Sequence, residues 1–349
     1  MWLPNGPPCL PFEHLRESFK VDIAVIGAGV TGALVVDALL RTGRSVAVLD
    51  RRGPAEGSTA ASTALLQFEL DTPLSLLSKQ IGRERAASAY WRSASAVNYL
   101  QGRIRDLGLR CAFKERTTVY LPGDVLDVKG LRSEAVLRAA LGLRSRFIAR
   151  DELFSLTTIE GPGAILSAGS GEVNPVALVA GLWRSAARRG ARLFSPVDVI
   201  DVESRPSFVL LTARGGLEVR AKHVVFATGY EPWKFVNMRG HRIVSTWVMA
   251  TPRQPKRLWP SRSLIWEASD PYHYLRTTSD GRILIGGADE DFADDKKRDS
   301  LIPTKVRGLR RRLEALLPAV DSTAEFAWAG SFGASTTGLP SMGEVPGAN

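Results

Sequence analysis

Cysteine is scarce in this sequence, since Cys9 and Cys111 are the only two among 349 residues. Two cysteines so far apart give neither a disulfide framework nor the paired spacing of a metal site. The most apolar stretch, residues 23–36, is interrupted by glycines and is too short to cross a membrane. Residues 1–20 contain four prolines and no apolar core of the signal-peptide type. We therefore expect a cytoplasmic protein without a transmembrane segment or a bound metal.

Internal repeats, low-complexity segments and a concentrated basic surface are also missing. A net charge of +10 suits an anionic partner such as nucleic acid. However, Lys and Arg are scattered, and the densest basic run, 307–312, falls within an amphipathic helical pattern over 304–317. Since no nucleic-acid-binding module is visible, we expect no nucleic-acid partner. The length favours about two domains.

The most informative stretch begins with a strand pattern over 21–26, whose apolar run 24–26 leads directly into the pattern Gly-x-Gly-x-x-Gly. A helical pattern follows, and then a β-branched strand over 45–49 that ends in Asp50. This order of strand, glycine turn, helix, strand and acid is typical of a dinucleotide-binding βαβ unit. The three glycines allow a tight turn, the approach of a pyrophosphate and close helix packing. The turn consists of Gly27, Ala28, Gly29, Val30, Thr31 and Gly32.

The carboxylate of Asp50 follows Gly27 by 23 positions. This is near the spacing of about 20 expected for the acid that holds ribose hydroxyls. The residues alone leave NAD, NADP and FAD open, as well as a glycine turn that binds nothing. Asp50 would repel the 2′-phosphate of NADP, although Arg51 and Arg52 could accommodate that group.

The rest of the chain predicts a discontinuous α/β (α+β) fold. A strand pattern over 221–226, with a continuous apolar core, suits a parallel sheet that is covered on both faces. Strand patterns over 243–251 and 263–268 and a hairpin over 272–286 suit an antiparallel sheet. Helical patterns cover 73–107, 131–141 and 176–189, and small residues mark a loop over 53–66.

We therefore expect a Rossmann-like nucleotide-binding domain and a second, mostly antiparallel β substrate domain, both discontinuous in sequence. Residues 1–20 would form an N-terminal arm. The nucleotide-binding domain would comprise 21–80, 171–230 and 325–349, and the substrate domain 81–170 and 231–324.

Further short motifs follow the glycine turn in a fixed order. They are Gly57-Ser58-Thr59-Ala60-Ala61-Ser62, Glu172-Val173-Asn174-Pro175, Val224-Val225-Phe226-Ala227-Thr228-Gly229, Tyr274-Leu275-Arg276 with Asp280-Gly281-Arg282, and Trp328-Ala329-Gly330 followed by Gly338-Leu339-Pro340. Together they resemble the flavin-dependent D-amino-acid oxidase superfamily, which includes glycine oxidase, sarcosine oxidase and gamma-glutamylputrescine oxidase-like enzymes. The resemblance implies FAD as cofactor and oxidation of an amine or amino acid by hydride transfer to the flavin.

The resemblance also implies which residues contact FAD. The loop of small residues over 57–63 would run beside the isoalloxazine, and the strand around Val199 would contact the adenine. The expected contacts beyond the glycine turn are Asp50, Arg51, Ser58, Thr59, Ala61, Ser62, Val199, Ala227, Thr228 and Gly229.

Two departures from the family pattern concern the end of the chain. Thr337 stands where the family usually has Asp before Gly-Leu-Pro. The family then continues with a strand, a Gly-rich turn and a helix that faces the pyrimidine edge of the flavin, whereas this sequence stops at Asn349. We expect a shortened member with an incomplete flavin site, weaker FAD binding and harder flavin reduction.

Arg276 and Tyr274 are the candidate substrate contacts, on the strand before the hairpin turn. A guanidinium fork suits a carboxylate. Several family members carry such an arginine two positions later, where this sequence has Thr278. A surface or ion-paired arginine is the alternative interpretation. Tyr272 shares a strand face with Tyr274.

Other polar and aromatic candidates have ordinary structural alternatives. His273 could act as a base or be a plain strand residue. Trp247 and Trp266 could wall an amine pocket or pack in the core. Glu69 and Asp71 could meet a cationic amine or be solvated acids. Two other functions stay open, a non-catalytic FAD-binding protein and an NAD-dependent dehydrogenase.

Overall fold

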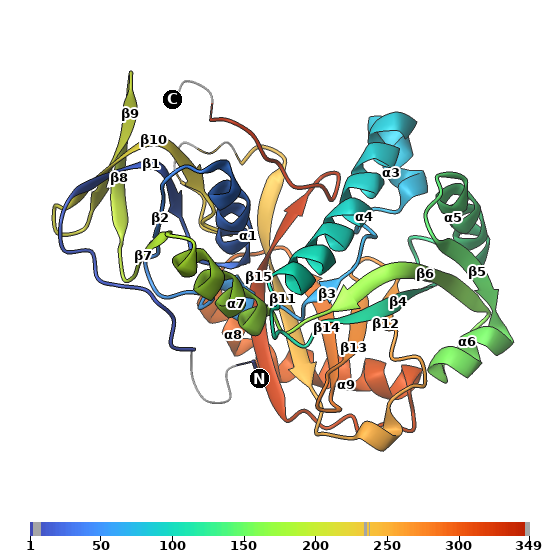
Figure 1. Cartoon of the computed structure of the whole chain (residues 1–349). Coiled ribbons are helices and arrows are strands. Elements are labelled where there is room, and N and C mark those ends of the chain that lie inside the picture. Colours follow the sequence, from blue (N-terminus) through green and yellow to red (C-terminus); the bar gives the residue numbers. More distant parts are fainter. Residues whose placement is uncertain (3–7, 234–235, 237, 346–349) are drawn as a thin grey trace.

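The computed structural model describes residues 1–2, 8–233, 236 and 238–345. Its strands form a smaller and a larger sheet, which lie side by side (Figure 1). Parts of the expected N-terminal arm, of the stretch 231–324 and of the C-terminal stretch 325–349 fall outside the described residues.

The smaller sheet has the strand order β7-β2-β1-β10-β9-β8. Its central strand β1 (Phe19–Ile26) pairs in parallel with β2 (Val46–Leu49) and β10 (Glu218–Phe226). The parallel strand predicted over 221–226 is therefore confirmed. The sheet is completed by β7 (Arg192–Phe194), β8 (Val199–Arg205) and β9 (Phe208–Ala213).

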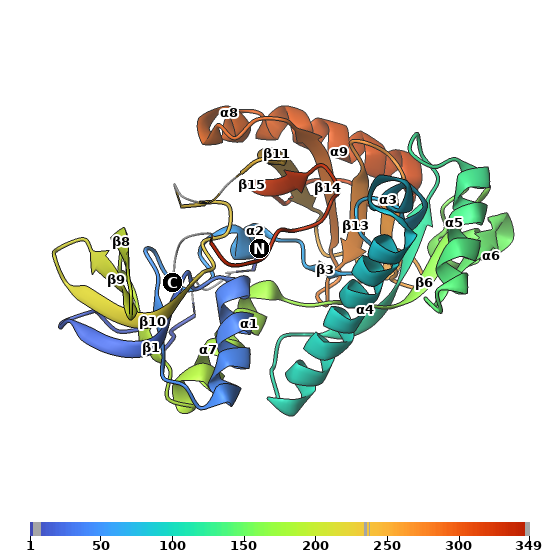
Figure 2. The same ribbon diagram turned by 90° about the horizontal axis from the view of Figure 1, so that it is seen from above.

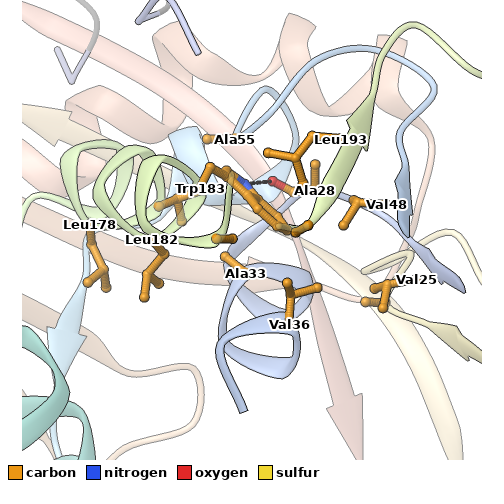
Figure 3. Packing of buried hydrophobic residues seen from close by; sticks show 14 of the residues in the cluster. Val25, Ala28, Ala33, Val36, Val48, Ala55, Leu178, Leu182, Trp183 and Leu193 are labelled. Carbon is orange, nitrogen blue, oxygen red and sulfur yellow. Dashed lines mark hydrogen bonds between the residues drawn. The ribbon is translucent and has the colours of Figure 1, made fainter. Parts of the chain in front are cut away.

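Two helices pack together beside this sheet, α1 (Val30–Leu39) and α7 (Pro175–Arg188) (Figure 1). The first turn of α7 is stabilised by Asn174, whose side-chain oxygen accepts a hydrogen bond from the Ala177 amide at 3.0 Å. Trp183 on α7 is completely buried between the helices and the sheet, and its indole N–H donates to the Ala28 carbonyl at 3.1 Å (Figure 3). The helix thus reaches the glycine turn directly.

The larger sheet has the strand order β15-β11-β14-β13-β12-β4-β6-β3, and β5 also pairs with β6. Every pair in this sheet is antiparallel except β12–β4, so the predicted mostly antiparallel sheet is confirmed. The strands are β3 (Leu65–Leu66), β4 (Lys114–Leu121), β5 (Ser145–Ala149), β6 (Gly163–Glu172), β11 (His241–Ala250), β12 (Leu264–Glu267), β13 (His273–Thr277), β14 (Ile283–Glu290) and β15 (Phe326–Ser335).

Helix α9 (Ile302–Leu316) packs its apolar side on β11, β14 and β15 (Figure 2). Leu309 and Leu313 are fully buried there, while the arginines of the basic run lie mainly on the other side. The other helices are α2 (Ser58–Ala61), α3 (Leu74–Ile81), α4 (Arg83–Asp106), α5 (Val128–Ala140), α6 (Arg150–Thr157) and α8 (Asp295–Ser300). Short 3₁₀ turns cover Leu40–Thr42 and Pro255–Arg257.

Three features differ from the sequence patterns. The stretch 53–66, expected to be a loop, contains the one-turn helix α2 and the short strand β3. Strands β3 and β15 belong to the larger sheet, although 21–80 and 325–349 are expected in the nucleotide-binding domain. The division of the chain into domains stays a prediction.

Candidate functional site

The glycine turn sits where β1 and β10 end side by side. Gly27 has a φ of +112°, and a Cβ there would overlap the Ala227 carbonyl. A Cβ at Gly32 would overlap the Gly27 carbonyl, so α1 lies directly against the turn. Both positions therefore need glycine, one for the conformation and both for the close approach.

Asp50 and Thr59 hydrogen-bond to the main chain of this turn. The Asp50 carboxylate accepts from the Ala28 amide at 2.7 Å and from the Arg52 amide at 2.9 Å. The Thr59 hydroxyl accepts from the Val30 amide at 3.0 Å, at the start of α1. The structure thus brings the turn, the acid at the end of β2 and the loop of small residues together.

The other expected FAD contacts lie around the same strand ends. The Ala227 amide donates to the Ile26 carbonyl at 2.8 Å, and Thr228 and Gly229 follow. Val199 comes two residues after Val197, whose amide donates to the Asp50 carbonyl at 2.7 Å. The side chains of Arg51 and Arg52 both form ion pairs with Glu231 at the surface.

Side chains from elsewhere bind four successive carbonyls of the loop that follows α2. The Trp328 indole donates to Ala61 O at 2.8 Å, and the Trp2 indole donates to Ser62 O at 2.8 Å. Arg276 donates to the next two carbonyls, at 2.8 and 2.9 Å. The loop is therefore held by the N-terminal segment, by β13 and by β15.

Arg276 does not contact the cavity, which corrects the expected substrate contact. Its side chain is only 3% exposed, and it also donates to the Val173 and Thr277 carbonyls. Glu172 lies 3.7 Å away as its ion-pair partner. Burial lowers the pKa of Arg276 to about 10, against the influence of Glu172. The sequence could not show that this strand face continues beneath the loop of small residues.

A cavity of ≈ 340 Å³ opens on the other side of that loop. Tyr272, Tyr274, Trp266 and Tyr230 give it an aromatic wall, and the Trp266 ring stacks on Tyr120 at 3.9 Å. Further lining residues are Ser58, Ala61, Ser62, Thr63, Ala64, Leu65, Gln67, Glu69, Asp71, Thr246, Val248, Asp289, Gly330, Ser331 and Phe332. Burial raises the pKa of Tyr274 to about 12, so its phenol stays protonated at neutral pH.

Two candidate residues lie elsewhere. Trp247 is fully buried beneath α8 and α9, and its indole donates to the Arg298 carbonyl at 3.0 Å. His273 points to the opposite face of β13 from the tyrosines, with Nδ1 2.9 Å from Glu267. Neither side chain is among those lining the cavity, so the structure favours core packing for Trp247 and an ordinary strand residue for His273 over the pocket wall and the catalytic base.

The described residues that line the cavity include three carboxylates and no Lys, Arg or His. Desolvation raises the pKa of Asp71, although Tyr272 donates a hydrogen bond to it at 3.2 Å. Desolvation and the charge of Asp71 likewise raise the pKa of Asp289. Glu69 accepts a hydrogen bond from Thr118 and faces Arg138 at 3.7 Å.

Asp289 was not found from the sequence. The hairpin expected from the sequence ends at residue 286, whereas β14 continues to Glu290. The sequence signal for Asp289 is an acidic residue just after the apolar strand pattern. In the part of the chain that the structure describes, there is no group of three or more acidic, His or Cys side chains suited to a metal ion. No described helix has the length and apolar character needed to span a membrane.

Comparison with known proteins identifies the class of protein that carries this site. A family model described as FAD dependent oxidoreductase matches residues 22–349, and the chain belongs to this family. The probable oxidoreductase OrdL of Rhizobium meliloti (strain 1021) is 24% identical over 96% of this chain and 78% of its own length. Gamma-glutamylputrescine oxidoreductase of Escherichia coli (strain K12) is 23% identical, over 96% and 79%.

Solved structures support the same fold. Glycine oxidase from Geobacillus kaustophilus aligns with a TM-score of 0.78 and 22% identity, covering 95% of this chain and 87% of the other. L-proline dehydrogenase from P. horikoshii aligns with a TM-score of 0.74 and 17% identity, covering 95% and 86%. The family resemblance, the fold class and FAD as the cofactor are thereby confirmed.

The residues of the turn and loop fit an FAD molecule. Gly29 has no side chain to fill the space in front of the turn, where a Cβ would meet only the Thr59 hydroxyl at 3.2 Å, and the first amides of α1 lie beside it. Asp50 reaches this turn from β2, and the loop of small residues leads from it to the cavity.

Proposed function

We propose that this FAD-dependent oxidoreductase oxidises a C–N bond of an amine or amino acid. The observation that carries the proposal is the position of the cavity. Its wall includes Ser58 and Ala61 to Ala64, and the same loop is hydrogen-bonded to the start of α1 through Thr59. A ligand in the cavity would lie against the loop that the family resemblance places beside the flavin ring.

The chain's own residues would have separate tasks. The turn amides that do not donate to Asp50 or Thr59 would hold the pyrophosphate, and Asp50 the ribose. When bound, FAD supplies the two-electron acceptor for a hydride from the carbon that bears the nitrogen. Tyr272, Tyr274 and Trp266 would exclude water and position the substrate carbon chain. A neutral reacting amine requires no protein base, whereas an amine that binds as an ammonium group must first give up a proton to a carboxylate or to water.

The names of the relatives support this substrate range. One curated relative is named for gamma-glutamylputrescine and another for glycine. Identities of 22–24% leave the particular amine open.

The test is to purify the protein, record its visible spectrum, and add amines and amino acids anaerobically. Bound flavin that is bleached by a member of this panel would support the proposal. Flavin that no member bleaches would instead favour a non-catalytic FAD-binding protein. Colourless protein that binds NAD and ignores FAD would favour an NAD-dependent dehydrogenase.

Two variants test the cofactor site. Asp50→Ala removes the acceptor of the Ala28 amide and of the expected ribose hydroxyls, and should weaken FAD binding by about 1–3 kcal/mol. Gly29→Val should be worse, because a side chain would occupy the pyrophosphate position. Gly343→Val is the matched control, since a Cβ at Gly343 meets nothing within 4 Å. Unchanged FAD affinity in both site variants would remove the turn from the site.

A further inference from the structure

We propose that the cavity selects a diamine, or another amine with a second cationic group, over an amino acid, with Asp71 and Asp289 as the specificity-determining residues. The inference rests on the proposed function, because it assigns the substrate class of the same cavity. It also makes a binding prediction that is independent of turnover.

The charges around the cavity favour a dication. Glu69 has Arg138 at 3.7 Å, but Arg138 also pairs with Glu134 at 2.8 Å. Asp71 and Asp289 have no ion-pair partner among the described residues. Lys305 acts on Asp289 only through its charge, and its ammonium group is bound to Glu290 at 2.7 Å. Two carboxylates therefore remain without a neutralising cation. When both are ionised, one ammonium group balances only one of them.

Oxygen atoms without donors provide a second, independent observation. Glu69 is 4% exposed, and its Oε2 atom has no hydrogen-bond partner. Gln67 Oε1 and Asp289 Oδ1 likewise have no hydrogen-bond partner, and all three residues line the cavity. Buried acceptors without donors create a negative potential that a cation or N–H donor relieves. The aromatic faces of Trp266 and Tyr272 also attract cations.

A substrate carboxylate finds no counterpart here. Among the described residues no basic side chain lines the cavity, and Arg276 donates to main-chain carbonyls on the other side of the loop. A substrate carboxylate in this space would face the carboxylates of Glu69, Asp71 and Asp289. Like charges brought together in this way disfavour recognition.

The experiment compares three ligands that share a four-carbon chain, namely 1,4-diaminobutane, 1-aminobutane and 4-aminobutanoate. Their affinities for the FAD-loaded protein are measured by calorimetry, and anaerobic flavin bleaching is recorded in parallel. The diamine should bind about 10- to 100-fold more tightly than 4-aminobutanoate, with 1-aminobutane between them. Asp71→Asn and Asp289→Asn should each weaken diamine binding about tenfold or more. Each should also reduce the difference in affinity between the diamine and 4-aminobutanoate.

Asp291→Asn is the matched control, because Asp291 lies two residues beyond Asp289, is exposed and should leave all three affinities unchanged. Thermal midpoints establish that each variant is folded. Tighter binding of 4-aminobutanoate, or diamine binding that neither cavity variant changes, would overturn the inference. Selective diamine binding, with no flavin bleaching by any member of the amine and amino-acid panel, would retain it and instead contradict the proposed oxidation.

Discussion

The guanidinium of Arg276 donates to carbonyls of three separate segments, at Thr63 and Ala64, at Val173, and at its own neighbour Thr277. Such a planar fork joins the loop of small residues to the larger sheet. Lysine cannot reproduce it, because an ammonium group is a point donor on a flexible stem. We therefore regard Arg276 as a positioning residue for the loop.

We expect Arg276→Lys to lower the free energy of unfolding by about 2–3 kcal/mol, since several buried carbonyls lose their donor. FAD should dissociate faster, while the ratio of KM values for amines with and without a carboxylate stays unchanged. Urea unfolding, flavin release and steady-state kinetics measure these effects. Arg253→Lys, at an exposed ion pair with Asp280, is the control. A rise in KM confined to carboxylate substrates, at unchanged stability, would place Arg276 in the cavity after all.

Replacing each of two helical glycines by alanine should change the stability of the protein in opposite directions. Gly32→Ala would place a Cβ into the Gly27 carbonyl and should destabilise the protein by about 2 kcal/mol or more. Gly102→Ala, within α4, meets nothing within 4 Å and should stabilise it by about 0.5–1 kcal/mol. The urea midpoints of the two variants measure these changes in stability. Equal shifts would mean that the glycine turn is not tightly packed against α1.

At the scale of elements, Asp37 connects three helices. It lies on α1, is 2% exposed, and accepts hydrogen bonds from Arg103 of α4 at 2.9 and 3.0 Å. Arg189, at the end of α7, donates to it at 2.6 Å. Burial alone would raise the pKa of Asp37, but the two arginines outweigh it and lower the pKa below its usual 3.8.

We expect Asp37→Asn to cost about 2–3 kcal/mol at pH 7, because two arginines lose their charged partner. A lowered pKa means that the stabilisation is complete above pH 3.8 and is lost as the pH falls through the lower value in the folded protein. The difference in stability between wild type and variant should therefore narrow below pH 3.8. Urea unfolding at several pH values tests this, with Asp106→Asn at an exposed carboxylate as the control. A constant difference down to the lowest pH would contradict it.

The elements predicted correctly from the sequence are those with a strong local pattern. The βαβ unit, α7, α9 and the hairpin of β13 and β14 all show clear periodicity or turn residues. Strand β6 contains three glycines and β15 two, with many small residues, so neither has an alternating apolar pattern. Their positions come from pairing with β4 and β11, which are distant in sequence.

The candidate site was predictable only in part for the same reason. The turn and Asp50 are close in sequence, so their spacing reveals them. The cavity depends on the register between strands: Tyr274 pairs with Gly286, where a Cβ would overlap the tyrosine ring. That empty position makes room for the phenol. Neither the register nor the direction in which Arg276 points can be derived from local spacing.

At the scale of the whole molecule, the cavity and the surface carry opposite charge. The net charge is +10, whereas the lining of the cavity is acidic. Helix α2 joins the two halves, since it packs against α7 beside one sheet and against β15 of the other (Figure 2). Because the net charge of the molecule is positive, a cationic ligand is attracted by the carboxylates of the cavity and is not steered to the protein from a distance. Its affinity should depend on the charge state of the carboxylates there.

Binding of 1,4-diaminobutane should weaken as the pH falls. The charges of Asp71, Asp270 and Lys305 act on Asp289, and Asp71 accepts a hydrogen bond from Tyr272. Desolvation raises the pKa of the Asp71 and Asp289 carboxyls above 3.8. Protonation on acidification thus begins above pH 3.8 and removes the charges that attract the ligand, while the molecule as a whole becomes more positive. A bound dication favours the ionised carboxylates, so binding in this pH range must release protons. Calorimetry in buffers of different ionisation enthalpy measures that release directly. The release should be smaller in both Asp71→Asn and Asp289→Asn, and an affinity without pH dependence in the unmodified protein would show that other groups hold the cation.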